Sequence, residues 1–130
     1  MTRKYRPPTD PTEWLDHAKS NLAHAQAESA EVWYEDLCFD AQQAAEKAIK
    51  AVFVHRGERF PFSHDLEEIF KILESNGLSV PKYVWSSIEL SQFAVVTRYP
   101  GFAAPVTKRT HRRAVRLAVG VLRWCERQIK

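Results

Sequence analysis

The sequence predicts an all-α fold, an up-and-down bundle of about five helices. Apolar residues recur at helical spacing along five segments, and no segment shows the sustained alternation of a β-strand. Short stretches with Pro or Gly separate most of these segments. With 130 residues, 45% of them hydrophobic and 27% charged, the chain has the length and composition of one globular domain. We therefore expect an extended N-terminal arm at 1–10 and a single helical domain at 11–130.

The first half of the chain contains two long predicted helices. Asp10 before Pro11 is a favourable helix start, and the first helix should run to about residue 29 or 30. The second should begin near Glu31 and end near Arg56, because Gly57 suits a C-cap. Its apolar stripe is rich in alanine, which allows another helix to approach closely; the stripe comprises Leu37, Ala41, Ala44, Ala45, Ala48 and Val52. Its polar side is a candidate lining for a groove or dimer seam and comprises Gln42, Gln43, Glu46, Lys47 and Lys50.

Three further helices follow. Ser63 or His64 is expected to cap the third, which should end at Asn76-Gly77. The fourth should begin at Pro81 and stop before Arg98-Tyr99-Pro100-Gly101, because a proline disfavours helical geometry at the residue before it. The fifth should begin near Thr107 and continue to the end of the sequence.

Several classes of function lack their sequence signatures. The chain has 4 glycines and no phosphate-binding glycine loop, no hydrolase GxSxG motif and no CxxC pair. No two histidines have the spacing of a helical metal site, so we expect neither a metal nor another cofactor. Cys38 and Cys125 fall within predicted helices and are expected to be small core residues. No leader peptide and no apolar run of membrane-spanning length is visible, so we expect a cytoplasmic protein without a membrane partner.

Positive charge is concentrated in the last quarter of the chain. From Arg98 to Lys130 there are nine Lys and Arg residues and a single acid, Glu126. On a helical wheel the apolar residues of the fifth helix lie on one side and six arginines on the other: Arg109, Arg112, Arg113, Arg116, Arg123 and Arg127. Such a stripe fits phosphate, RNA or an acidic partner, but a solvated helix face is an equally ordinary interpretation. Both interpretations stay open at this point.

Four short motifs resemble the HEPN domain family, the higher eukaryote and prokaryote nucleotide-binding domains. They are the helix at 41–51 with the sequence Ala-Gln-Gln-Ala-Ala-Glu-Lys-Ala-Ile-Lys-Ala, then Ser63-His64-Asp65-Leu66, Leu90-Ser91 and Thr97-Arg98-Tyr99-Pro100-Gly101. The likeness covers about residues 12 to 128. It implies an up-and-down helical bundle that usually forms a homodimer. It also implies frequent pairing with small nucleotidyltransferases, often in toxin–antitoxin-like modules.

Some branches of the family are metal-independent ribonucleases that use an Arg followed, after four to six residues, by a His. Arg98 occupies the position of that Arg, but the positions for the His hold Ala103, Ala104 and Pro105. His111 lies in the next helix, on its apolar side. Arg59 and His64 have the required spacing, but they fall between the second and third helices. An Arg alone can stabilise phosphate charge but does not transfer a proton near neutral pH.

These observations favour a non-catalytic module that binds a nucleotide, RNA or a partner protein and pairs with a small nucleotidyltransferase. The alternatives are a ribonuclease toxin of the same fold with a displaced catalytic His, and a structural partner whose basic face meets an acidic protein. We expect no catalytic residue, and the candidate phosphate-binding residues are Arg98, Arg109, Arg112, Arg113, Arg116 and His64. Arg98 could instead cap the fourth helix, and His64 could be a helix cap or turn residue. Trp33, Trp85 and Phe93 are candidate apolar groups for a dimer interface.

Overall fold

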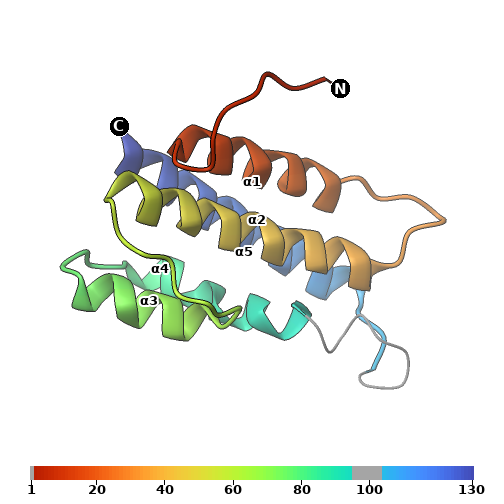
Figure 1. The fold of residues 1–130 in the computed structure, drawn as a ribbon. Helices are drawn as coiled ribbons and strands as arrows, with labels where there is room; N and C mark the ends of the chain where they lie inside the picture. Colours follow the sequence, from red (N-terminus) through yellow and green to blue (C-terminus); the bar gives the residue numbers. More distant parts are fainter. Residues whose placement is uncertain (1, 95–103) are drawn as a thin grey trace.

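The three long helices lie alongside one another, and a shorter layer packs against one side of them (Figure 1). This computed structural model describes residues 2–94 and 104–130. The long helices are α1 (Pro11–Ala25), α2 (Tyr34–His55) and α5 (Lys108–Ile129), and the shorter layer comprises α3 (Leu66–Ser75), α4 (Lys82–Trp85) and the 3-10 segment η1 (Ser86–Phe93). No strand occurs in the described part of the chain. The predicted all-α helical bundle is confirmed.

Helix α2 is the centre of the core because its alanines let α1 and α5 approach it closely. The six residues of the predicted apolar stripe are all buried. The prediction for the polar side is wrong at Gln42, which is fully buried. Its amide nitrogen donates to Glu46 Oε1 at 3.2 Å and its Oε1 accepts from Gln43 at 2.7 Å, so both ends of the amide are satisfied.

The connection between α1 and α2 is longer than predicted. Helix α1 ends at Ala25 instead of residue 29 or 30, and α2 begins at Tyr34, with Trp33 as its N-cap, instead of near Glu31. All residues from Gln26 to Trp33 are exposed. Since no apolar face beyond Ala25 packs on a neighbour, helix propensity alone does not extend α1.

The start of α3 is one or two residues later than predicted. Asp65 is the N-cap, and its Oδ1 accepts from Glu67 N at 3.0 Å, while Ser63 Oγ accepts from Asp65 N at 3.0 Å. Ser91 Oγ, from η1, accepts from Leu66 N at 2.9 Å. Three residues therefore share the capping of this helix, one of them from another element.

The fourth predicted helix is a single α turn followed by a 3-10 segment. Ser86 Oγ donates to Lys82 O at 3.2 Å and Ser87 Oγ to Val84 O at 2.5 Å. These hydroxyls compete for the carbonyls that a continuing α-helix would use, which is a physical reason for the change of helix type. The predicted end of this helix before Arg98 lies outside the described residues.

Candidate functional site

Helix α5 presents its arginines to solvent and its apolar residues to the core. All six arginines of the predicted stripe are exposed. Its buried residues include His111, Ala114, Ala118, Leu122 and Cys125. The predicted orientation of the helix is therefore confirmed, including the placement of His111 on the apolar side. We call the six residues Arg109, Arg112, Arg113, Arg116, Arg123 and Arg127 the arginine face.

Two members of the arginine face are held by the α4–η1 layer. Arg113 Nε donates to Glu89 Oε1 at 2.5 Å and its Nη2 donates to Glu89 Oε2 at 2.9 Å. Arg127 Nη2 donates to Tyr83 Oη at 2.5 Å. The other four arginines make no hydrogen bond or ion pair with another described residue. They are Arg109, Arg112, Arg116 and Arg123.

The Arg113–Glu89 contact is a two-bond fork, the geometry in which guanidinium and carboxylate groups pair best. The hydrogen bond from Arg113 lowers the pKa of Glu89 below its ordinary value, and the same bond raises the pKa of Arg113. Both side chains are partly open to solvent, with 52% of Arg113 and 38% of Glu89 exposed. Pairs with this exposure are weak because water competes for both partners.

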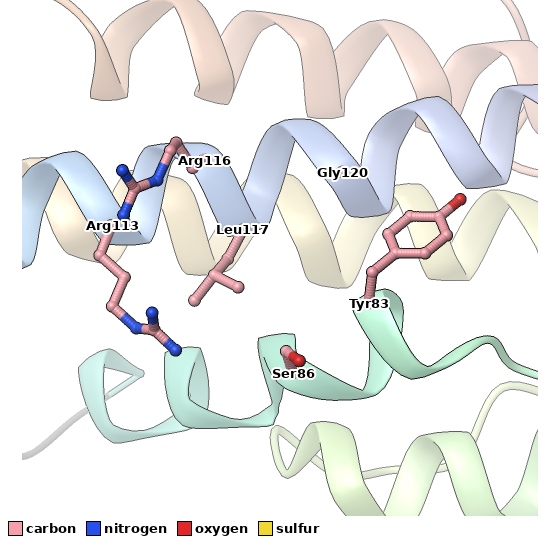
Figure 2. A pocket seen from close by; sticks show the side chains of 6 residues that line it. All are labelled: Tyr83, Ser86, Arg113, Arg116, Leu117 and Gly120. Carbon is pink, nitrogen blue, oxygen red and sulfur yellow. The ribbon is translucent and has the colours of Figure 1, made fainter.

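An open pocket of about 260 Å³ lies between the arginine face and the α4–η1 layer (Figure 2). Arg113 and Arg116 stand at one end and Tyr83 at the other, with Leu117 and Ser86 between them. Gly120 forms the wall beside Tyr83, where a Cβ would lie 3.6 Å from Tyr83 Cδ2. The pocket thus combines cationic donors at one end with an aromatic ring at the other.

His64 lies apart from this pocket, in the loop before α3. Its Nδ1 is 2.7 Å from Glu46 Oε1, and its side chain is 66% exposed. No hydrogen bond or ion pair among the described residues joins it to the arginine face. His64 connects α2 to the start of α3, so the motif residues Glu46, His64, Leu66 and Ser91 meet at one junction. Arg98 lies outside the described residues.

Four residues of this site were not predicted from the sequence: Tyr83, Ser86, Glu89 and Gly120. The position of Gly120 could have been predicted from the sequence. Arg113, Gly120 and Arg127 are spaced by seven residues, so the three residues lie on the same face of the helix. The pairing of Glu89 with Arg113 had no local signal, because 24 residues separate them. Their meeting depends on how η1 packs on α5.

Neither thiol has the environment of a nucleophile. Burial, with a smaller effect of Glu35, raises the pKa of Cys38 to about 12, and burial also raises the pKa of Cys125 well above its ordinary value. Within residues 2–94 and 104–130, no three His, Cys, Asp or Glu side chains are grouped as a metal site would need. Nor does any helix in those ranges have the length and apolar character needed to cross a bilayer.

The fold and the pocket define the chain as a helical bundle with an open, arginine-lined site. A family model for the HEPN domain matches residues 12–128. The chain belongs to the HEPN domain family, which confirms the resemblance seen in its motifs.

Two solved structures are similar to the chain. TT1696 from Thermus thermophilus has a TM-score of 0.78 and 29% identity, over 92% of this chain and 98% of that one. ST0689, described as an archaeal HEPN homologue, has a TM-score of 0.75 and 25% identity, over 100% of both chains. No protein with a curated description matches the chain.

Proposed function

We propose that this protein is a non-catalytic HEPN module that binds a nucleotide, RNA or an acidic partner protein through its arginine face. The observation that carries the proposal is the set of four exposed arginines that form no hydrogen bond or ion pair with another described residue. Like charges on one helix face repel one another, so this arrangement does not stabilise the helix by itself. It does create a positive surface potential that attracts polyanions before specific contacts form.

The HEPN fold also supports a small nucleotidyltransferase as the protein partner, in a toxin–antitoxin-like pair. This part of the proposal rests on the family resemblance. The arginine face is a suitable surface for an acidic region of such a partner. A neighbouring gene for a small nucleotidyltransferase, and co-purification of its product with this chain, would support the pairing.

The first prediction is that replacing Arg109, Arg112, Arg113 and Arg116 by Gln weakens binding of labelled single-stranded RNA at low salt. Affinity of the unmodified protein should fall steeply as salt rises, because counterions are released when phosphates are neutralised. The variant should bind more weakly and show a smaller salt dependence. Fluorescence anisotropy at two salt concentrations measures both effects.

A matched variant removes the same amount of charge elsewhere on the surface. Lys4, Lys19, Arg59 and Lys71 are exposed and lie outside α5. Replacing these four by Gln should weaken RNA binding less than the α5 variant does. Equal binding by the unmodified protein and the α5 variant would contradict a nucleic-acid site on the arginine face, and so would the absence of any RNA binding by the unmodified protein at low salt. Either result would favour the acidic partner protein as the ligand.

The ribonuclease alternative depends on His64, whose Nδ1 is held by Glu46 and whose ring is largely exposed. A carboxylate-held imidazole can transfer protons. The surroundings argue against RNA cleavage, since Asp65, Glu67 and Glu68 are exposed acids next to it. We expect RNA to stay intact in EDTA. Cleavage that a His64→Ala substitution abolishes would instead establish the nuclease.

A further inference from the structure

Glu89 does not line the pocket itself, but it holds two hydrogen-bond donors of a residue that does. Its carboxylate takes the Nε and Nη2 donors of Arg113, one of the two arginines at the end of the pocket. Phosphate oxygens are recognised by the same paired donors of a guanidinium. A carboxylate and a phosphate therefore compete for Arg113.

Arg116 supplies the free charge beside this pair. It lies three residues after Arg113, so the two side chains leave neighbouring positions on α5. Arg116 is exposed and makes no hydrogen bond or ion pair with another described residue. An anion bound to Arg116 therefore lies next to the Arg113 donors that Glu89 holds.

Tyr83 forms the other end of the pocket. Its phenolic oxygen is held by Arg127, and one edge of its ring faces Gly120, where a Cβ would be 3.6 Å away. The residue is 47% exposed, which leaves ring surface open to a ligand. Arg113 and Gly120 are seven residues apart, about 10 Å along the helix axis. A ligand with an anionic group such as a phosphate at one end and a flat ring at the other therefore suits the two ends of the pocket.

We propose that the pocket between α5 and the α4–η1 layer binds one nucleotide unit, with its phosphate on Arg113 and Arg116 and its base beside Tyr83, and that Glu89 acts as a built-in competitor for the phosphate. This inference rests on the proposed function, because it assigns a specific site within the arginine face. Binding moves Arg113 from Glu89 to the ligand. The η1 segment then loses its fork contact with α5, so ligand binding is coupled to the attachment of η1.

The test is titration calorimetry with AMP, ribose 5-phosphate and a short single-stranded RNA. Glu89→Gln should tighten AMP binding about three- to tenfold, because Arg113 is released for the phosphate. The control is Glu126→Gln, which removes the same charge from α5 itself but at a carboxylate that pairs with Lys19 at 3.2 Å. An equal gain in both variants would show that only net charge matters and would overturn the role of Glu89.

A second comparison distinguishes binding in the pocket from non-specific electrostatic attraction of an anion to the arginine face. Arg116→Gln should weaken AMP binding about tenfold, and Arg123→Gln, on the same face but outside the pocket, should weaken it by a smaller factor. Equal losses would overturn the pocket while leaving the arginine face as an RNA-binding surface. Failure of AMP and RNA alike to bind the unmodified protein at low salt would overturn the pocket and also the nucleotide and RNA forms of the proposed function, leaving the acidic partner protein.

The ligand series tests the two ends of the site. AMP should bind more tightly than ribose 5-phosphate, and Tyr83→Leu should remove that difference. Equal affinity for the two ligands would overturn the stacking role of Tyr83. If RNA binds but AMP does not, the pocket does not take a free nucleotide. The pocket would then bind a nucleotide unit within RNA only if Glu89→Gln tightens RNA binding and Arg116→Gln weakens it. Any other result would overturn the pocket. Thermal unfolding of each variant confirms that it is folded.

Discussion

His111 shows how one polar side chain joins two helices in the core. It is only 3% exposed, its Nε2 is 2.7 Å from Ala25 O, and its ring stacks on Tyr34 at a centroid distance of 5.2 Å. A carbonyl oxygen only accepts, so the hydrogen bond requires the proton on Nε2. His111 thereby ties the first turn of α5 to the last residue of α1 and the first residue of α2.

The second prediction is that His111→Ala lowers the free energy of unfolding by about 2–4 kcal/mol, because a ring-sized cavity and an unpaired buried carbonyl are left behind. Urea unfolding measures the change. His111→Gln should restore part of the loss if its amide reaches the Ala25 carbonyl. An alanine variant as stable as the unmodified protein would show that the ring and its hydrogen bond contribute nothing to stability.

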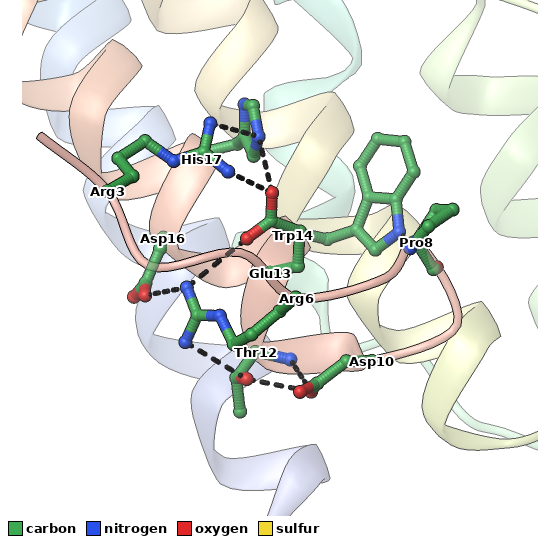
Figure 3. A network of polar contacts seen from close by, with 9 residues as sticks. All are labelled: Arg3, Arg6, Pro8, Asp10, Thr12, Glu13, Trp14, Asp16 and His17. Carbon is green, nitrogen blue, oxygen red and sulfur yellow. Dashed lines mark hydrogen bonds and ion pairs between the residues drawn. The ribbon is translucent and has the colours of Figure 1, made fainter.

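At the scale of elements, the N-terminal arm is attached to α1 by a network of charged groups (Figure 3). The Glu13 carboxylate accepts a hydrogen bond from Arg3 and lies 3.3 Å from Arg6 Nη2. It also lies 3.1 Å from His17 Nε2. Arg6 forms a second ion pair, with Asp16. Trp14 Nε1 donates to Pro8 O at 2.8 Å. The arm is therefore held to α1 by side chains, although its described residues, 2–10, form no helix or strand.

The third prediction concerns the pH dependence of this attachment. Burial of Glu13 acts to raise its pKa, but hydrogen bonds with Arg3 and His17 outweigh it and the net pKa is lowered from its ordinary value of 4.5. A carboxyl with a lowered folded-state pKa stabilises the fold above its unfolded pKa, and the stabilisation is lost as pH falls through the folded pKa. The unmodified protein should therefore melt at a higher temperature than Glu13→Gln near neutral pH, and the difference should shrink below pH about 4.

The matched control for that experiment is Glu31→Gln. Glu31 is exposed in the connection between α1 and α2, and no side-chain partner of its carboxylate is described. Its melting temperature should follow that of the unmodified protein throughout the pH series. A difference for Glu13→Gln that stays constant down to about pH 3 would contradict the assigned role of the carboxylate.

The backbone of α5 does not require a glycine at position 120, because Gly120 lies within a regular helix. A Cβ there would meet Tyr83 Cδ2 at 3.6 Å, an ordinary van der Waals distance, and the residue is in the interior of a regular helix. Glycine in a helix interior costs about 1 kcal/mol relative to alanine. Gly77, by contrast, has φ of +96° after α3, a conformation that other residues adopt only with strain.

The fourth prediction is that Gly120→Ala stabilises the protein by up to about 1 kcal/mol, whereas Gly77→Ala destabilises it by about 1 kcal/mol or more. Denaturant unfolding of both variants gives the comparison. Destabilisation by Gly120→Ala would mean that the Tyr83 ring cannot accept the added methyl group.

For the molecule as a whole, the structure shows which of the apolar side chains predicted for a dimer interface are exposed. Of the three predicted apolar groups, Phe93 is only 2% exposed, and Trp85 is half-buried, stacks edge-on against Phe70 and donates to Glu74 Oε2 at 3.3 Å. The prediction is wrong for Phe93, which packs within the chain. Trp85 is partly covered by contacts within the chain, and its place in a dimer interface stays a prediction. Trp33 stays 70% exposed at the start of α2.

The fifth prediction is that the protein is a dimer in solution through a surface that includes Trp33. Sedimentation at micromolar concentration should give twice the chain mass of 15.0 kDa. Trp33→Ser should weaken the dimer, because a large aromatic side chain is a common interface anchor. Tyr5→Ser, at a side chain 82% exposed in the arm, is the control. A clean monomer at high concentration would remove the proposal.

Much of the fold was predictable because helical periodicity is a local property. The buried stripe of α2 and the exposed arginines of α5 follow from residue spacing alone, and Asp10 and Thr107 cap the helices that they were expected to begin. The predictions failed where packing decides a boundary. The end of α1, the 3-10 conformation of η1 and the burial of Gln42 each depend on contacts or hydrogen bonds that helical spacing does not indicate.

The sequence by itself determined that this protein is a helical bundle with its positive charge on one face of the last helix. Only the tertiary structure decided which of those arginines form a hydrogen bond or ion pair with another described residue. Glu89 meets Arg113 and Tyr83 meets Arg127 across 24 and 44 residues, so no local pattern indicates either pairing. The physical reason is that helix periodicity sets the direction of a side chain, whereas its partner is set by the packing of another element against that face.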